Sequence, residues 1–208
     1  MERTSPLLTD LYQLTMLQAY FDQGMTDTAV FEFFVRKLPP GRNFLMAAGL
    51  EQVLSYLEQL QFSEQELDWL AACGRFSGRF VDWLHNFRFT GDVHAMPEGS
   101  IFFADEPILR VTAPLPQAQL IETRVINLLQ CQTMVASKAA RVRLAAPYKL
   151  LVDLACGARM APKPACCRHG PVTWRDLTAA PTCWRRWNGA FRSLAPWPTP
   201  SLRPTTWK

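Results

Sequence analysis

One long helical pattern dominates the chain, starting near Gln119 and stopped by Pro147. Its apolar residues recur at three-, four- or seven-residue steps, which predicts a helix that faces the protein core. These residues are Ile121, Val125, Leu128, Val135, Ala139 and Val142. The charged residues expected largely on its other faces are Glu122, Arg124, Lys138 and Arg143. The run 149–153 then resembles a buried strand of a parallel sheet or barrel, so we expect an α/β layer to begin here.

The start of the chain predicts a helix followed by two strands. Thr9 is a suitable N-cap for a helix over 10–23, and Gly24 is a suitable stop. The stretch 28–36, TAVFEFFVR, alternates its side chains and predicts a strand with one aromatic face. Residues 44–48 fit the partner strand of that hairpin, because a Pro-Pro-Gly turn lies between the two stretches.

The middle of the chain predicts short helices and then strands. Ser63 and Glu66 have the spacing of a capping box, which predicts a helix to about Cys73. Helices are also expected over 49–60 and near 78–87. From 89 to 111 we expect strands, separated by turns at Gly91, 97–99 and 105–107.

Composition changes sharply after Asp153. Up to that residue the chain has 13 Lys and Arg against 17 Asp and Glu, whereas the remainder has nine basic residues against Asp176 alone. The net charge of +4 is therefore the sum of −4 and +8. The later part also holds eight of the 16 prolines, five of the seven tryptophans and four of the six cysteines. Proline at such spacing disfavours helices and central strands, so we expect 154–208 to be an aberrant, disordered tail with exposed Trp side chains.

The sequence also indicates a cellular compartment. No apolar run is long enough to span a bilayer, and the N-terminal MERTSPLLTD lacks the apolar segment of a signal peptide. We therefore expect a cytoplasmic protein without a membrane partner. In a reducing compartment, Cys73 and Cys131 are expected to be buried free thiols rather than a disulfide.

Several blocks, all in the same order, carry a resemblance to a known family. The opening TDLYQLTM precedes FEFFVRKLPPGRNFLMAAGLEQVLSYLEQL, and GDVHAMPEGSIFFADEPILRVTAPLPQAQLIET precedes NLLQCQTMVASKAARVRLAA. Residues 5–153 resemble nicotinate phosphoribosyltransferase throughout. The resemblance implies a type II phosphoribosyltransferase-like architecture, with an α+β N-terminal domain over 1–117. The first helix and strand of a truncated α/β barrel would follow over 118–153. It also implies an active site at the barrel's C-terminal face, completed across a homodimer interface.

The resemblance also implies a reaction. The family joins nicotinate to phosphoribosyl pyrophosphate in NAD biosynthesis, with Mg²⁺ and with ATP hydrolysis through a phosphohistidine. Tyr12 falls on the substrate-binding position where the opening motif's tyrosine contacts the nicotinate ring, and packing within the first helix is the alternative. Lys138 and Arg141 are candidates to face phosphates, although such a stripe is usually a solvated face. His85 and His94 lie outside any motif that would make them catalytic. We expect no catalytic residue, no metal ligand and little Mg²⁺ or ATP binding in this chain.

The family's next motif should follow Asp153 directly, as a glycine and two arginines before an alanine–histidine–glycine step. The chain instead reads LACGARMAPKPACC. Restoring one base in the codon of Leu154, with permitted codons, yields FGLRRAHGAEAGLL. We therefore interpret 154–208 as the same gene read out of frame. The family's phosphohistidine would then exist only in the restored frame, and His169 would not be its equivalent.

Other interpretations of the tail are a metal site and a nucleic-acid arm rich in Arg and Trp. Both are disfavoured, because adjacent Cys166 and Cys167 lack a chelating spacer and the frame interpretation already explains the composition. We expect neither a metal nor a nucleic-acid partner. The residues of the alternative metal site would be Cys156, Cys166, Cys167, His169 and Cys183.

For the chain as a whole we weigh ancestry and activity separately. By descent it resembles an enzyme of NAD biosynthesis, but as written we expect it to be truncated and inactive. The alternative is a non-catalytic fragment that can only fold or associate. Quinolinate and nicotinamide phosphoribosyltransferases are the runner-up enzymes, disfavoured by the TDLYQLTM and FEFFVRKLPPGRN blocks.

Overall fold

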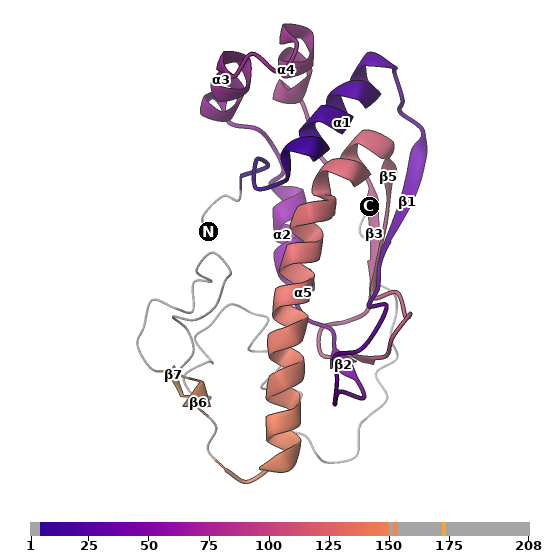
Figure 1. Ribbon diagram of the computed structural model, residues 1–208, viewed down its shortest axis with the longest axis vertical. Coiled ribbons are helices and arrows are strands. Elements are labelled where there is room, and N and C mark those ends of the chain that lie inside the picture. The colour runs from indigo at the N-terminus through magenta and orange to yellow at the C-terminus, as the bar shows by residue number, and fades with distance from the viewer. Residues whose placement is uncertain (1–4, 150–151, 154–171, 174–208) are drawn as a thin grey trace.

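A computed structural model of the chain describes residues 5–149, 152–153 and 172–173. It contains both helices and short strands (Figure 1). The helices are α1 (Leu11–Asp22), α2 (Leu50–Glu58), α3 (Glu64–Ala72), α4 (Gly78–His85) and α5 (Leu115–Ala145). The strands are β1 (Thr28–Phe33), β2 (Leu45–Met46), β3 (Asp92–Ala95), β4 (Ile101–Phe102), β5 (Leu109–Pro114), β6 (Val152–Asp153) and β7 (Val172–Thr173).

Helix α5, the longest helix described, packs against α1, α2 and the strands β1, β2 and β5. The strands β1 and β5 lie on one side of it, α2 lies on the other, and α1 packs near its N-terminal end (Figure 1). The helix begins at Leu115, earlier than predicted, because Pro116 is compatible with the first helical turn, where no N–H is needed. It ends at Ala145, just before the predicted stop at Pro147.

Two predictions about the faces of α5 are wrong. Arg124, expected on an outer face, is only 9% exposed and packs near Tyr56 of α2. Val142, expected to face the core, is 43% exposed. A single apolar stripe describes a helix with one packed side, whereas α5 has both helices and strands as neighbours.

The main sheet is antiparallel, with strand order β1-β5-β3. Phe31 lies opposite Val111, and Glu32 lies opposite Arg110, whose Nε donates to the Glu32 carboxylate at 2.7 Å. The aromatic face predicted for β1 is confirmed, because Phe31 and Phe33 pack against the core. The predicted hairpin is wrong, since β2 pairs with β4 rather than with β1. The chain between β1 and β2 therefore connects two separate sheets.

The helix ends show where local signals decide the structure. The capping box at α3 is confirmed, because the Ser63 hydroxyl accepts from the backbone N–H of Glu66 and the Glu66 carboxylate accepts from that of Ser63. Gly24 adopts a φ of 65° after α1, as the predicted stop requires. The predicted N-cap is wrong, since α1 begins after Asp10 and the buried Thr9 hydroxyl has no hydrogen-bond partner among the described residues. The Asp10 side chain makes no cap either, because it accepts from Thr123 of α5.

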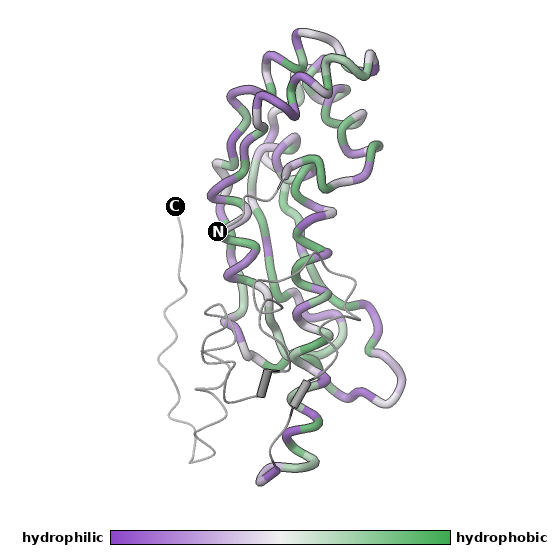
Figure 2. Tube along the Cα trace, turned by 90° about the vertical axis from the view of Figure 1, so that its left-hand side faces the viewer, coloured by the Kyte–Doolittle hydropathy of each residue, from purple (hydrophilic) through white to green (hydrophobic). Residues whose placement is uncertain are grey.

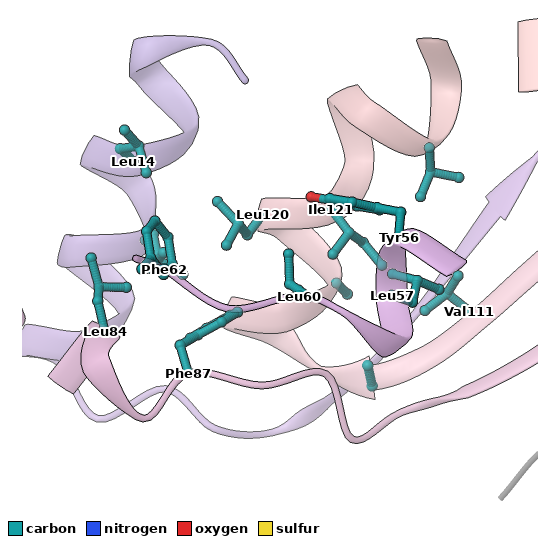
Figure 3. Close-up of a cluster of buried hydrophobic side chains, with 14 of the residues drawn as sticks. Leu14, Tyr56, Leu57, Leu60, Phe62, Leu84, Phe87, Val111, Leu120 and Ile121 are labelled. Atoms are coloured by element: carbon teal, nitrogen blue, oxygen red, sulfur yellow. The ribbon is translucent and has the colours of Figure 1, made fainter. Parts of the chain in front are cut away.

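The largest core cluster draws on all five helices and the main sheet (Figure 3). Apolar and polar residues alternate along the helices, as elements with one packed face require (Figure 2). Among the buried side chains are Leu14, Tyr56, Leu57, Phe62, Leu84, Phe87, Val111, Leu120 and Ile121. Cys73 and Cys131 are free thiols, as predicted, although both are half-buried rather than buried.

The strand after α5 differs from its prediction. Val152 pairs antiparallel with Thr173, and Asp153 with Val172, whereas the pattern indicated a parallel strand. The other predictions for 154–208, including the exposure of its tryptophans, lie outside the described residues. Within the described ranges, no helix is long and apolar enough to cross a membrane.

Candidate functional site

Tyr12 lies in the first turn of α1 and keeps 53% of its surface exposed. About half of the residue is therefore packed against its surroundings, and half is accessible to a ligand. Its hydroxyl oxygen accepts a hydrogen bond from Gln13 Nε2 at 3.1 Å. The ring is thus held at one point and open to solvent, as a ligand-contacting side chain should be.

Gln13 is the buried centre of a polar network between α1 and α5, with no exposed surface. Its Nε2 lies 3.3 Å from Glu122 Oε2 and 3.3 Å from Thr123 Oγ1. Its Oε1 accepts from the side-chain amide of Gln119, and Thr123 Oγ1 donates to Asp10 Oδ2 at 3.3 Å. The two hydrogens of Gln13 Nε2 are shared among three acceptors, the third being the Tyr12 oxygen. Such a buried network fixes one relative position of its elements. The first turn of α1 is therefore anchored to α5.

Sequence reasoning missed Gln13, although a signal was present. The residue stands four positions before Leu17 and next to Leu14, so helical spacing places it on the side of α1 that faces the core. A glutamine at such a position needs buried partners for its amide. Helical spacing does not identify those partners, because Gln119 and Glu122 lie in a distant part of the chain.

A groove of about 520 Å³ lies between β1 and α5. This is within the range of roughly 300–1,000 Å³ that is usual for small-molecule sites. Glu32 and Glu122 line it together with Arg36 and Lys37, so charges of both signs are present. Because Glu122 also binds Gln13, the groove wall and the Tyr12 network share a residue. Its apolar lining includes Phe31, Phe33, Leu45, Val125 and Met134.

Buried titratable groups elsewhere have structural explanations. Burial raises the pKa of Glu98, while hydrogen bonds from backbone N–H groups oppose that rise. One such bond joins Gly49 N to Glu98 Oε1 at 2.9 Å, so this carboxylate caps the N-terminus of α2. Burial also raises the pKa of Tyr56 and lowers that of Arg124. These shifts reflect packing around α2 and α5, not a catalytic arrangement near Tyr12.

The other candidate residues lie apart on different elements. Lys138 and Arg141 are exposed on the C-terminal half of α5, which fits a solvated face. His85 ends α4, where its Nε2 lies 3.1 Å from Glu64 Oε1 at the surface. His94 is exposed in β3. No group of three His, Cys, Asp or Glu side chains suited to a metal ion occurs among the described residues, and the alternative metal site at Cys156 to Cys183 lies outside them.

Similar solved structures define the class of protein. The chain superimposes on human nicotinic acid phosphoribosyltransferase with a TM-score of 0.63 and 37% identity, covering 68% of this chain and 29% of that one. A nicotinate-nucleotide pyrophosphorylase from Pyrococcus furiosus shares the fold, with a TM-score of 0.52 and 22% identity over 69% of this chain and 30% of that one. The α+β arrangement of the described residues is therefore that of a phosphoribosyltransferase N-terminal part.

Sequence comparison narrows this class to one family. Residues 7–130 match the family model of the nicotinate phosphoribosyltransferase (NAPRTase) N-terminal domain. Nicotinate phosphoribosyltransferase pncB2 of Mycobacterium tuberculosis is 51% identical over 160 residues, or 77% of this chain and 34% of its own. The Bacillus subtilis nicotinate phosphoribosyltransferase is 41% identical over 138 residues, which cover 66% of this chain and 28% of the relative. The chain belongs to the nicotinate phosphoribosyltransferase family, a family of enzymes, and spans about a third of the length of these relatives.

Proposed function

We propose that this chain contributes the N-terminal domain of an enzyme that forms nicotinate mononucleotide from nicotinate and phosphoribosyl pyrophosphate. The observation that carries this proposal is the 51% identity over 160 residues to a nicotinate phosphoribosyltransferase. The domain would comprise residues 1–117, and 118–153 would begin an α/β barrel. The product would enter NAD biosynthesis, and the intact enzyme would be a cytoplasmic homodimer.

In this proposal the Tyr12 ring contacts nicotinate. Three features support that role: the residue lies in the TDLYQLTM motif, its side chain is half exposed, and its position is fixed through Gln13 to α5. An exposed aromatic ring on a rigid support can stack on a small aromatic acid without reorganising.

The rest of the chemistry belongs to the part of the relatives that this chain does not span. Mg²⁺ and ATP fit the proposed reaction, but the described residues offer no cluster of carboxylates or histidines near Tyr12 to hold them. His85 and His94 lie on α4 and β3, whereas Tyr12 lies on α1. We therefore assign phosphate binding and the phosphohistidine to the remainder of the intact enzyme.

We also propose that residues 154–208 result from a change of reading frame, which leaves the 208-residue chain inactive. The similarity to the M. tuberculosis relative covers 160 of the 208 residues, so 48 residues lie outside it. The frame change would set a limit to the similarity near Asp153. The second candidate is a non-catalytic fragment that only folds or associates. The partial match to the relatives favours it as well.

Substrate choice tests the proposed function. The gene with one base restored near codon 154 would be expressed and read to its natural end. The purified protein would receive phosphoribosyl pyrophosphate, ATP and Mg²⁺, with nicotinate, nicotinamide or quinolinate offered separately. We expect turnover with nicotinate alone. Preferential use of quinolinate or nicotinamide would replace this proposal with one of the runner-up enzymes.

A Tyr12→Ala substitution in the same protein tests the assigned contact. We expect KM for nicotinate to rise by up to about tenfold, because an aromatic contact contributes roughly 0.5–1.5 kcal/mol. KM for phosphoribosyl pyrophosphate should change less. Tyr20→Ala, on the same helix, is the matched control. Equal effects of Tyr12→Ala on both substrates would indicate a packing role instead.

A further inference from the structure

The hydrogen bonds around Gln13 have a fixed direction. A carboxylate oxygen accepts hydrogen bonds, so the atom of the Gln13 amide that faces Glu122 must be its nitrogen. The amide oxygen correspondingly faces the side-chain amide of Gln119. Glu122 and Gln119, both from α5, therefore determine which way the amide of Gln13 points.

This direction determines how the hydrogen of the Tyr12 hydroxyl can be used. The same Gln13 nitrogen lies 3.1 Å from the Tyr12 oxygen, which must act as the acceptor because an NH₂ group only donates. The phenolic hydrogen is then left for another acceptor. No protein acceptor for it occurs within the described part of the chain, and the ring is half exposed.

We propose that Gln13 is a positioning residue that keeps the Tyr12 hydroxyl as an outward hydrogen-bond donor for an acceptor atom on the ligand. The ligand part of this inference rests on the proposed function, in which Tyr12 meets a small aromatic acid. Such a ligand offers two acceptors, a carboxylate oxygen and a pyridine nitrogen. Tyr12 would then contribute a directed hydrogen bond in addition to its ring contact.

Because these hydrogen bonds have a fixed direction, Gln13→Glu and Gln13→Leu should affect the Tyr12 hydroxyl differently. In Gln13→Glu the oxygen that replaces the amide nitrogen must carry a proton to face the Glu122 carboxylate. That oxygen still has a lone pair to accept the Tyr12 hydrogen, so the hydroxyl turns inward and the ligand loses its donor. In Gln13→Leu the Tyr12 oxygen no longer accepts a hydrogen bond from residue 13. The hydroxyl keeps its own hydrogen, which it can still donate to the ligand. Gln18 provides a matched control, because its side chain anchors α1 to α4 by accepting from Ser77 N at 2.9 Å, and it takes no part in the Tyr12 network.

The geometry is tested on the 208-residue chain itself by fluorine NMR, with 3-fluorotyrosine at its four tyrosines. Tyr12→Phe identifies the Tyr12 resonance. We expect Gln13→Leu to shift that resonance while those of Tyr20 and Tyr56 stay in place, and Gln18→Leu to leave the Tyr12 resonance unmoved. A Tyr12 resonance unchanged by Gln13→Leu, or a similar shift of all the resonances, would overturn the inference.

The ligand part is tested by kinetics of the frame-restored enzyme. We expect Tyr12→Phe and Gln13→Glu each to raise KM for nicotinate by roughly twofold to tenfold, the range for one uncharged hydrogen bond. Gln13→Leu should have a smaller effect, and kcat and KM for phosphoribosyl pyrophosphate should stay constant. Inhibition by benzoate, which lacks the ring nitrogen, identifies the acceptor: sensitivity to Tyr12→Phe assigns the carboxylate, and insensitivity assigns the nitrogen.

These outcomes separate the inference from the proposed function. An enzyme that uses nicotinate but is unaffected by both Gln13 variants would refute the role of Gln13 alone. A frame-restored protein without nicotinate turnover would refute the proposed function, and the NMR result would still decide whether Gln13 directs the Tyr12 hydroxyl. A fall in kcat together with a rise in both KM values would assign Gln13 a purely structural role.

Discussion

Gly91, which precedes β3, is the described glycine at which an added Cβ would meet the closest neighbouring atoms. A Cβ atom at this glycine would lie 2.4 Å from the Cβ of Ala113 and 2.6 Å from the carbonyl oxygen of Thr112, both in the central strand β5. Its φ lies outside the positive range, so an alanine is not strained by conformation. The expected cost of Gly91→Ala therefore comes from this contact alone.

The size of the effect follows from the distances. Carbon atoms in contact normally lie about 3.5–4.0 Å apart, so β3 and β5 would have to separate locally by about 1 Å. Overpacking of this kind costs about 1–3 kcal/mol. Replacing glycine also restricts the unfolded chain, which returns about 0.4–1 kcal/mol. The difference lies between about 0 and 2.6 kcal/mol, so we expect Gly91→Ala to lower the free energy of unfolding by about 1 kcal/mol.

Urea unfolding followed by far-UV circular dichroism measures this change in the purified chain. Gly78→Ala is the matched control, because an added Cβ at the start of α4 meets no atom within 4 Å. That substitution should raise the unfolding midpoint slightly, whereas Gly91→Ala should lower it at an unchanged m-value. If both variants shifted the midpoint in the same direction, the close approach of β3 and β5 would be refuted.

Two further substitutions test features of the fold in the same assay. Ser63→Ala removes the hydroxyl of the α3 capping box and should lower the free energy of unfolding by about 1 kcal/mol. An unaltered urea midpoint would contradict this expectation. Glu98→Gln tests the pKa raised by burial. A carboxyl group with a raised pKa in the folded state binds more protons folded than unfolded. It therefore makes the free energy of unfolding fall as pH rises from the unfolded value of about 4.3 to the folded value. Glu98→Gln keeps an oxygen to accept from Gly49 N and should reduce that slope, so equal slopes in both proteins would contradict the pKa shift.

Features encoded within a few residues could be predicted from the sequence. Ser63 and Glu66, three residues apart, each accept a hydrogen bond from the backbone N–H of the other. Gly24 adopts the left-handed conformation that ends α1. The alternation around Phe31 and Phe33 likewise places one face of β1 against the core. In each case the physical cause lies within the segment, so no knowledge of the tertiary fold was needed.

Features that depend on distant partners could not be predicted in this way. Arg124 is buried because α2 packs over it, and the periodicity of α5 alone does not contain that neighbour. The partner of β2 is β4, although the turn after β1 favoured a hairpin. The site shows the same limit: the family motif singles out Tyr12, whereas the partners of Gln13 lie on α5.

Formation of nicotinate mononucleotide tests the central claim most directly, namely that this chain carries the N-terminal domain of a nicotinate phosphoribosyltransferase without the part that completes its site. The purified 208-residue chain and the frame-restored enzyme would be assayed side by side with nicotinate, phosphoribosyl pyrophosphate, ATP and Mg²⁺. We expect product from the restored enzyme and none from the chain, because losing groups that bind phosphate or carry the phosphoryl intermediate usually costs several kcal/mol each. Turnover by the 208-residue chain within about tenfold of the restored enzyme would contradict this account.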